Sequence, residues 1–158
     1  MNRHSLRLMA TFRDKYLGGM TDVSVLDVGA SAAYDSRRRS YRMVFAPPRF
    51  DYHGMDVEPG PNVDIVGYED LEPRGYDILV SGQTMEHVRR PWEWLKNLTR
   101  YFRQYICIIA PHTWEEHRCP IDTYRYFPDG MRDLFAYAKI RPIEIYKTDG
   151  GLTVGIGQ

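Results

Sequence analysis

Small and polar residues follow the first segment of this 158-residue sequence that has the composition of a buried strand. That segment ends with Asp27 and Val28, and Gly29 and Ser31 come soon after. Glycine lets the backbone turn sharply and lets a ligand approach the main chain. Because the second and third glycines of a dinucleotide-binding loop are missing, a pyrophosphate cradle is disfavoured, and the Asp27 carboxylate suits a cationic or amine-bearing ligand better. The alternative is a plain strand-end turn at Gly29.

A carboxylate ends the second expected strand, 27 residues after Gly29. In this position, Asp56 can accept hydrogen bonds from both hydroxyls of a ribose. The alternative is a solvated aspartate that binds no ligand. Gly29 and Asp56 together predict one pocket, with a tight bend on one side and a carboxylate that holds a sugar diol on the other.

Glu86 and His87 place an acid and a base side by side after another expected strand, which ends at Ser81. His117 lies in the long segment 111–127, which is rich in aromatic, histidine and arginine residues. Long loops over the end of a sheet are usually functional, and a neutral imidazole can accept a proton at pH 7. We therefore expect His117 first, and His87 second, to act as a general base. For His87 the alternative is a structural role, in which a hydrogen bond orients its loop.

The same long segment supplies the residues that we expect to contact a substrate, namely Trp114, Arg118, Tyr124 and Arg125. The two arginines could bind an anionic group, or they could form ion pairs with Glu115, Glu116 or Asp122. A separate run of arginines at 37–39, with Arg42 and Arg49, is either a solvated helix face or a surface that steers an anionic acceptor.

The hydrophobic pattern predicts strands and helices that alternate along the chain. We expect strands at 22–28, 51–57, 63–66, 76–81, 105–110, 140–146 and 152–156, and helices at 3–17, 37–45, 91–104 and from residue 128 onward. Alternation predicts an α/β fold whose mostly parallel sheet has helices on both faces. Residues 149–151 (Asp-Gly-Gly) predict a hairpin between the last two strands. Ligands of such sheets bind at the carboxyl ends of the strands, near the switch point of the topology.

Composition predicts one domain over residues 1–158, with the helix in 1–19 packed on its core. Hydrophobic residues make up 43% of the chain, which argues against disorder. Because 21 Lys and Arg balance 21 Asp and Glu, a dedicated nucleic-acid binder is disfavoured. The two cysteines make no disulfide framework. No stretch approaches the ~20 apolar residues of a membrane span, and the charged start does not resemble a signal peptide. We expect a cytoplasmic protein without a membrane anchor.

Four segments, taken together, resemble the class I S-adenosylmethionine-dependent methyltransferases, and the small type 11 group of that family in particular. The segments are VLDVGAS at 25–31, YHGMDVEPGPNVD at 52–64, YDILVS at 76–81 with EHV at 86–88 and PW at 91–92, and Pro111, Trp114, His117, Pro120, Asp122, Tyr124 and Arg125 with the stretch 128–134. Each motif is short, but their order and spacing over residues 20–147 match the family.

The resemblance implies a Rossmann-like, mostly parallel sheet of seven strands with a C-terminal antiparallel hairpin. It also implies S-adenosyl-L-methionine as the cofactor, which leaves as S-adenosyl-L-homocysteine. The loop at Gly29 would face the methionine part, Asp56 would bind the ribose and Val57 would contact the adenine. The full set of expected cofactor-binding residues is Asp27, Gly29, Ala30, Ser31, Asp56, Val57, Tyr68, Glu69, Ser81, Gly82 and Gln83.

The predicted function is methyl transfer to an oxygen or nitrogen of a small-molecule or carbohydrate-like acceptor. Ala30, Ala33 and Tyr68 depart from the family pattern, which would fit a catalytically silent protein that keeps the fold for binding or assembly. A nucleic-acid methyltransferase is disfavoured, because the chain lacks the Asn/Asp-Pro-Pro-aromatic element used on base amino groups. A short chain with an open site would also suit a homodimer.

We expect no metal at this site. Some methyltransferases with a Glu-x-x-Glu-His element bind a divalent ion, but Gln83 stands at the first position of that element here. The alternative is a borderline metal that uses His117 and Cys119 as further ligands.

Overall fold

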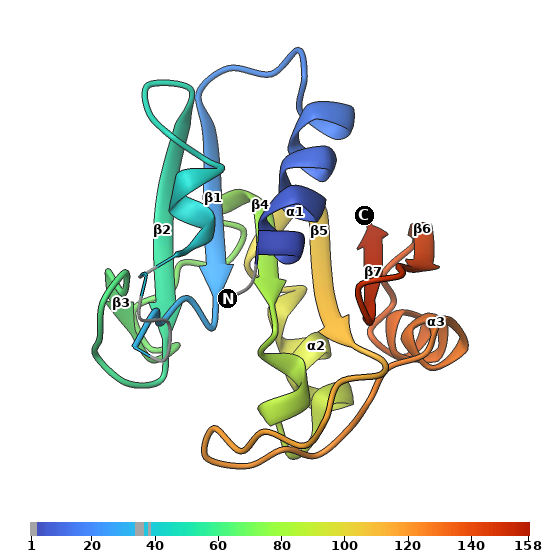
Figure 1. Ribbon diagram of the computed structural model, residues 1–158. Helices are drawn as coiled ribbons and strands as arrows, with labels where there is room; N and C mark the ends of the chain where they lie inside the picture. Colours follow the sequence, from blue (N-terminus) through green and yellow to red (C-terminus); the bar gives the residue numbers. More distant parts are fainter. Residues whose placement is uncertain (1–2, 34–36, 38) are drawn as a thin grey trace.

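The computed structural model describes residues 3–33, 37 and 39–158. One seven-stranded sheet runs through the molecule in the order β3-β2-β1-β4-β5-β7-β6 (Figure 1). The strands are β1 (Val23–Val28), β2 (Phe50–Asp56), β3 (Ile65–Val66), β4 (Tyr76–Gly82), β5 (Phe102–Pro111), β6 (Pro142–Lys147) and β7 (Leu152–Gly157). The helices are α1 (Arg3–Tyr16), α2 (Pro91–Leu98) and α3 (Pro128–Tyr137), with the short turns η1 (Tyr41–Met43) and η2 (Met85–His87).

Strands β1 to β5 pair in parallel, and β7 lies antiparallel between β5 and β6. The chain runs from β1 outward to β2 and β3 and then returns to β4, so the switch point lies between β1 and β4. The predicted mostly parallel sheet with a terminal hairpin is therefore confirmed. In Figure 1 the parallel strands point toward the bottom of the view, where η2 and the segment 112–127 lie.

Two predicted helices differ from the structure. The helix predicted at 91–104 is α2, which ends at Leu98. It ends there because the next residues turn and the Tyr101 carbonyl accepts a hydrogen bond from the Tyr76 backbone N–H. This contact brings the chain into the sheet, and β5 begins at Phe102. Within the predicted helix at 37–45, the described residues contain one short helical turn, η1, at Tyr41–Met43. Arg38 lies outside the described residues.

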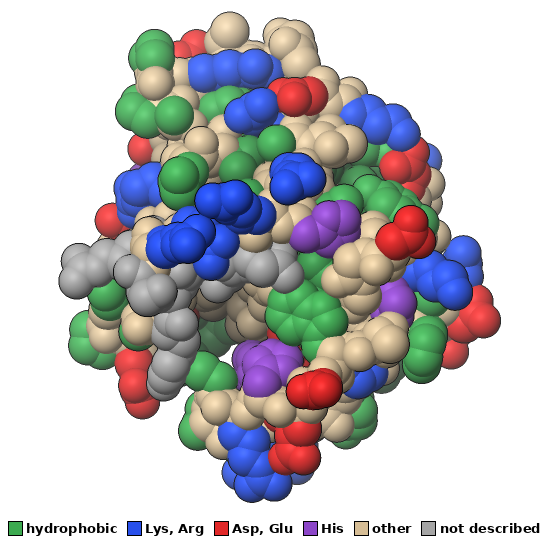
Figure 2. All heavy atoms as spheres, in the orientation of Figure 1, with side chains coloured by type: hydrophobic (Ala, Val, Ile, Leu, Met, Phe, Trp, Pro, Cys, Tyr) green, Lys and Arg blue, Asp and Glu red, His purple; other side chains and the backbone are tan. Residues whose placement is uncertain are grey.

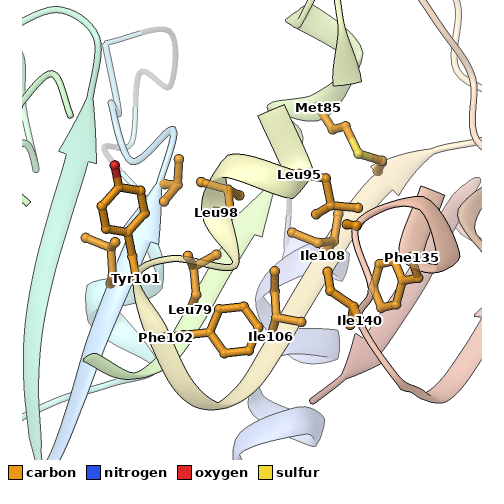
Figure 3. Packing of buried hydrophobic residues seen from close by; sticks show 14 of the residues in the cluster. Leu79, Met85, Leu95, Leu98, Tyr101, Phe102, Ile106, Ile108, Phe135 and Ile140 are labelled. Carbon is orange, nitrogen blue, oxygen red and sulfur yellow. The ribbon is translucent and has the colours of Figure 1, made fainter. Parts of the chain in front are cut away.

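The central strands carry apolar side chains on both faces, which is why they read as continuous hydrophobic runs. In β4, Leu79 packs with Leu95 and Leu98 of α2, whereas Ile78 and Val80 point to the opposite face and pack in the layer of α1. Figure 3 shows the first of these layers, with Phe135 of α3 beside it.

Helix α1 covers the second face through Met9 and Phe12, both buried. A buried hydrogen bond of 2.6 Å joins Ser5 of this helix to the Tyr41 hydroxyl. The Tyr41 ring in turn lies directly against Gly82, so that a Cβ at this position would be 1.9 Å from the hydroxyl oxygen. The glycine at the end of β4 is thus required by packing. None of the described helices is long and apolar enough to span a bilayer.

Candidate functional site

The bend after β1 and the carboxylate at the end of β2 lie side by side. Gly29 has a φ of 80°, and its N–H and that of Ala30 both donate to the Met55 carbonyl. The Ser31 N–H donates to Asp56 Oδ2 at 3.0 Å, and the Val57 N–H donates to Asp56 Oδ1 at 2.7 Å. The two predicted halves of the pocket therefore meet at the carboxyl edge of the sheet. Figure 2 shows a hollow just below the middle of the view, beside a histidine side chain.

Gly29 is also the place where the loop after β1 meets the loop after β4. A Cβ on Gly29 would lie 2.1 Å from Thr84 Oγ1, which is closer than any real contact. A side chain at position 29 would also have to adopt a left-handed backbone conformation that favours glycine. Position 29 therefore needs glycine for a close approach between two loops as well as for the turn.

An apolar surface flanks the Asp56 carboxylate. Val57 is 68% exposed, and Val66, which pairs with Asp56 across the sheet, is 47% exposed. Exposed valines at two adjacent strand ends can pack against the face of a flat ring. Val57 was expected from the sequence, whereas Val66 was missed, although an apolar residue at the end of the neighbouring strand was a signal that could have found it.

Tyr68 and Glu69 follow β3. The Tyr68 hydroxyl accepts a hydrogen bond of 2.9 Å from the Trp94 indole N–H, and its ring stacks on Tyr101. Burial raises the pKa of Tyr68 to about 12. These contacts tie Tyr68 to the layer of α2, while the Glu69 carboxylate lies beside Gly67.

Asp27 and Ser81 lie beneath the loop rather than on its surface. The Asp27 carboxyl is buried and accepts a hydrogen bond from the Tyr52 hydroxyl. Burial raises the pKa of Asp27 to about 7. The Ser81 hydroxyl is also buried and donates to the Val28 carbonyl at 2.6 Å. Both side chains brace the end of β1 against its neighbours.

The buried Asp27 carboxyl predicts a pH-dependent stability. Its pKa is 3.8 when exposed and about 7 when folded, so the folded protein binds the proton more tightly. The stability that this proton provides is complete below pH 4 and is lost as the pH rises through 7. We expect Asp27→Asn to remove this loss, which is worth at most about 4 kcal/mol in total and about 3 kcal/mol between pH 5 and pH 8. Urea unfolding of both proteins at pH 5 and pH 8 measures it, and an equal difference at the two pH values would contradict it.

Gln83 directly follows β4 and has a strained backbone conformation. Its φ is 60°, in the left-handed region, and its side-chain Oε1 is buried without a hydrogen-bond partner among the residues that the structure describes. Strain of this kind persists where the surrounding structure enforces it and is frequent at functional sites. The orphaned oxygen can accept a hydrogen bond from a ligand.

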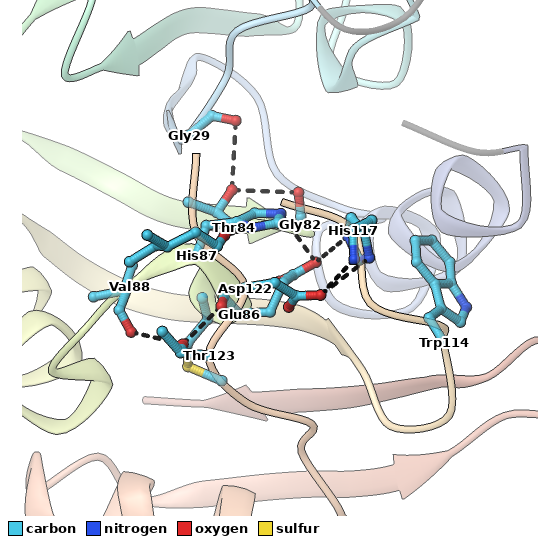
Figure 4. Close-up of polar contacts among 12 residues, drawn as sticks. Gly29, Gly82, Thr84, Glu86, His87, Val88, Trp114, His117, Asp122 and Thr123 are labelled. Carbon is cyan, nitrogen blue, oxygen red and sulfur yellow. Dashed lines mark hydrogen bonds and ion pairs between the residues drawn. The ribbon is translucent and has the colours of Figure 1, made fainter. Parts of the chain in front are cut away.

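Glu86, His87 and His117 come together at the edge that Gly29 and Asp56 occupy (Figure 4). Glu86 is fully buried, and its Oε1 lies 3.8 Å from His87 Nε2 and 3.7 Å from His117 Nε2. The two imidazole rings meet edge to face, with 5.0 Å between their centroids. The sequence singled out the two histidines as candidate bases and noted Glu86 beside His87, but it assigned Glu86 no catalytic or binding role. The position of this acid next to a candidate base was the signal in the sequence that could have assigned Glu86 a role.

Burial changes the charge of two members of this cluster. It raises the pKa of Glu86 to about 8 and lowers the pKa of His87 below its ordinary value of 6.5. Both shifts disfavour the charged form, because desolvation penalises an ion more than a neutral group. Groups with shifted pKa values that share one edge of a cleft are candidates for proton transfer.

Arg125 holds the segment 112–127 together. Its guanidinium donates to both Asp122 carboxylate oxygens at 2.6 Å and to the carbonyls of Trp114, Glu115 and Tyr124. All the side-chain nitrogens of Arg125 therefore bind within the segment. The sequence left open whether the two arginines form ion pairs. In the structure Arg125 pairs with Asp122, and Arg118 pairs with Glu116.

The remaining two expected substrate contacts lie on the same segment. The Trp114 indole donates to the Gly150 carbonyl at 3.2 Å, and its ring lies 5.7 Å from that of His117. Tyr124 is 41% exposed and packs beside Tyr126. Trp114 thus borders the cluster of Glu86 and the histidines.

The arginines of the basic patch are partly structural. Arg42 donates to Asn62 Oδ1 and pairs with Asp64, and its guanidinium lies over the Tyr52 ring. Arg49 donates to the carbonyls of Leu17 and Met20. Arg38 of this patch lies outside the described residues.

Removing the Arg125 clamp is expected to destabilise the protein. The Asp122 side chain is 2% exposed, so Arg125→Met leaves a buried carboxylate without its partner. We expect a loss of about 2–4 kcal/mol in urea unfolding, less than for a fully enclosed pair because Arg125 itself is 22% exposed. The matched control is Arg118→Met, whose ion pair with Glu116 is exposed on both sides and is expected to contribute little to stability. Equal losses in the two variants would argue against the clamp.

The sequence matches no family profile and no curated protein. Solved structures with the same fold are S-adenosylmethionine-dependent methyltransferases. One from Aquifex aeolicus is 17% identical, with a TM-score of 0.67 over 99% of this chain and 98% of that chain. Magnesium protoporphyrin IX methyltransferase from Synechocystis PCC 6803, solved with bound SAH, is 11% identical, with a TM-score of 0.69 over 98% and 81% of the two chains.

A third similar structure is the methyltransferase in a complex with the Haloferax volcanii Trm112 methyltransferase activator. It is 16% identical, with a TM-score of 0.65 over 94% of this chain and 86% of that chain. The predicted resemblance is confirmed at the level of the fold, which is the class I methyltransferase fold with strand order 3-2-1-4-5-7-6.

Proposed function

We propose that this protein transfers a methyl group from S-adenosyl-L-methionine to an oxygen or nitrogen of a small-molecule or carbohydrate-like acceptor. The observation that carries the proposal is the contact of the Ser31 N–H with Asp56 Oδ2, beside the bend at Gly29 and next to the switch point of the sheet. A loop and a carboxylate in this arrangement suit a nucleoside.

The residues present fit the cofactor. Each Asp56 oxygen accepts one backbone N–H and keeps a lone pair for a ribose hydroxyl. Val57 and Val66 offer an apolar face for the adenine. The orphaned Gln83 oxygen can accept a hydrogen bond from an ammonium group. We propose that Gly29, Ala30 and Ser31 line the methionine part, that Asp27 and Ser81 support them from below, and that Glu69 and the backbone at Gly82 complete the walls.

Transfer needs alignment above all. When bound, the cofactor supplies a sulfonium methyl group, which the acceptor attacks in line as the carbon–sulfur bond breaks and S-adenosyl-L-homocysteine forms. The protein holds the acceptor in position, which can contribute about 7–11 kcal/mol. We propose that His117 removes the acceptor proton at Nε2, because its Nδ1 is held by the Glu115 carbonyl. His87 shares this role or orients the loop.

Acceptor contacts would come from the segment that carries His117. Trp114 and Tyr124 offer rings, and Arg118 offers a positive charge at the rim. Arg125 keeps the segment in shape through Asp122. We also propose a cytoplasmic location, which the two free cysteines suit, and a homodimer that would close the open side of the site.

Calorimetry with S-adenosyl-L-methionine and S-adenosyl-L-homocysteine tests the proposal. We expect both to bind the folded protein at one site per chain. The same preparation is then incubated with a panel of phenols, amines, carboxylates and sugars, and S-adenosyl-L-homocysteine release is measured. No binding by the folded protein would contradict the proposed function. Binding without transfer to any acceptor would favour the catalytically silent alternative, and transfer to structured RNA would favour the nucleic-acid alternative.

A further inference from the structure

Three potential metal ligands converge at the carboxyl end of β4. One carboxylate oxygen of Glu86 and one ring nitrogen each of His87 and His117 lie within 4.8 Å of one another. Two ligands of a tetrahedral zinc ion, each about 2.0–2.2 Å from it, lie about 3.3–3.6 Å apart. The observed separations of 3.7 and 3.8 Å from Glu86 Oε1 to the two Nε2 atoms exceed this by a few tenths of an ångström. The site would close around an ion if the side chains moved to this spacing, which the two ring nitrogens, within 4.8 Å of each other, must also reach.

Backbone carbonyls fix which nitrogen of each ring faces Glu86. His87 Nδ1 lies 2.6 Å from the Ile121 carbonyl oxygen, and His117 Nδ1 lies 3.0 Å from the Glu115 carbonyl oxygen. Since a carbonyl only accepts, each Nδ1 must carry the hydrogen. In the neutral rings both Nε2 atoms then present lone pairs toward the carboxylate. Metal-binding histidines typically have this arrangement, with the second nitrogen held by a carbonyl or carboxylate.

The Glu86 carboxylate faces acceptors rather than donors. Both of its oxygens are buried without a hydrogen-bond partner among the described residues, and the Glu86 side chain is 0% exposed. A buried carboxylate is costly unless it is paired or coordinates a metal. Here two ring nitrogens that act as acceptors in the neutral imidazoles, His87 Nε2 and His117 Nε2, lie within 3.8 Å of its Oε1. A cation between the three atoms would satisfy all of them.

The surrounding contacts hold the ligands in place. Thr123 donates from its N–H and its hydroxyl to the Glu86 carbonyl, and the Tyr126 hydroxyl donates to the Met85 carbonyl, so η2 is fixed to the segment 112–127. On the other side, Asp122 Oδ2 accepts the His117 backbone N–H at 2.6 Å and lies 3.6 Å from its Nδ1. Figure 4 shows the contacts of Thr123 and Asp122 around the cluster. Such support keeps the three side chains near the geometry that binding needs.

We propose that Glu86, His87 and His117 bind one divalent transition-metal ion, such as Zn²⁺ or Fe²⁺. Two imidazoles and one carboxylate suit these ions, whereas Mg²⁺ prefers an all-oxygen set. Three protein ligands leave at least one coordination position open, and the partly exposed His117 places it toward solvent. The sequence predicted no metal because Gln83 replaces one carboxylate of the element. The structure brings in His117 from a segment 30 residues further along the chain.

Metal binding itself does not depend on the proposed function. The consequence of metal binding for methyl transfer does rest on the proposed function. With an ion bound, His117 Nε2 would be a metal ligand, and His117 would act on the acceptor through the ion. A metal ion can lower the pKa of an oxygen that it binds. An acceptor hydroxyl at the open position would then release its proton to solvent water, without needing a free imidazole.

The test titrates Zn²⁺ into the full chain, free of any affinity tag and treated with EDTA. We expect one zinc per chain and a rise in melting temperature. Glu86→Gln and His117→Ala should each weaken zinc binding by at least about 100-fold, the upper end of the cost of losing a residue that merely supports a ligand. His53→Ala removes a histidine from β2 and serves as the control, with unchanged zinc affinity. Mg²⁺ should bind none of these proteins measurably.

Melting temperatures in EDTA confirm that each variant folds, and if Glu86→Gln fails to fold, His117→Ala still decides. Absence of zinc binding by the folded wild type, or unchanged binding in His117→Ala, overturns the proposal. Calorimetry with S-adenosyl-L-homocysteine on the EDTA-treated protein separates the two proposals. Cofactor binding without zinc binding removes the metal site alone, whereas zinc binding without cofactor binding supports the metal site and contradicts the proposed function.

Discussion

Asp56→Asn is expected to weaken the binding of S-adenosyl-L-homocysteine by about 100-fold or more. Hydrogen bonds to a charged acceptor contribute about 1.5–3 kcal/mol each, and the ribose offers two. The substitution keeps the shape of the side chain and one oxygen, but it removes the charge and one acceptor. Isothermal titration calorimetry measures the change directly.

Asp51→Asn is the matched control, because Asp51 lies in the same strand and its side chain is 74% exposed. We expect its affinity for the cofactor product to equal that of the wild type. Both variants should unfold at similar urea concentrations, since the amide oxygen introduced at position 56 can still accept one of the two backbone hydrogen bonds. Equal affinities in the two variants would show that the ribose does not lie at Asp56.

His117→Ala is expected to slow methyl transfer by about 10²–10⁴-fold, which is the usual contribution of a positioned base. The effect is expected whether Nε2 takes the proton itself or holds an ion that acts on the acceptor. Cofactor affinity should stay unchanged, because His117 belongs to the cluster with Glu86 and not to the contacts of Asp56. The measurement is the single-turnover rate with the acceptor that the panel identifies.

His53→Ala serves as the control for this rate, since His53 lies within β2 and makes its ring contact with Tyr76 at the start of β4. A transfer rate in His117→Ala equal to that in the control would exclude His117 from the reaction. A fall in cofactor affinity instead of rate would move His117 from the acceptor side of the site to the cofactor side.

The fold could be predicted because the strands of a buried parallel sheet are continuous apolar runs. Ile78, Leu79 and Val80 face alternate sides, and both sides are covered, so every position in the run is hydrophobic. Helix and strand boundaries that depend on long-range contacts could not be predicted as well from the sequence. The helix predicted to reach 104 ends at Leu98, because the Tyr101 carbonyl pairs with Tyr76, a contact that no local pattern shows.

The juxtaposition of Gly29 and Asp56 could also be predicted from the sequence, since the two residues lie at the ends of adjacent strands whose order follows from the fold. The acceptor side could not. Arg125 was expected to contact a substrate, but its donors all turn inward to Asp122 and backbone carbonyls. Its role depends on how the segment 112–127 folds on itself, and a loop of this length has many possible conformations.

Glu86 illustrates the same limit. Its neighbour His87 was visible in the sequence as a possible base, but the importance of Glu86 comes from its complete burial and from His117, which arrives from a distant segment. Burial of a charged residue is rare without a partner. Only the three-dimensional arrangement reveals that this acid has no hydrogen-bond partner among the described residues.

A crystal structure of the protein with S-adenosyl-L-homocysteine tests the central claim most directly. The account predicts both ribose hydroxyls within hydrogen-bonding distance of the Asp56 carboxylate, the adenine against Val57 and Val66, and the sulfur on the side of Glu86 and His117. Density for the ligand at another surface, or side chains of the folded protein filling the space between Gly29 and Asp56 at saturating ligand, would contradict it.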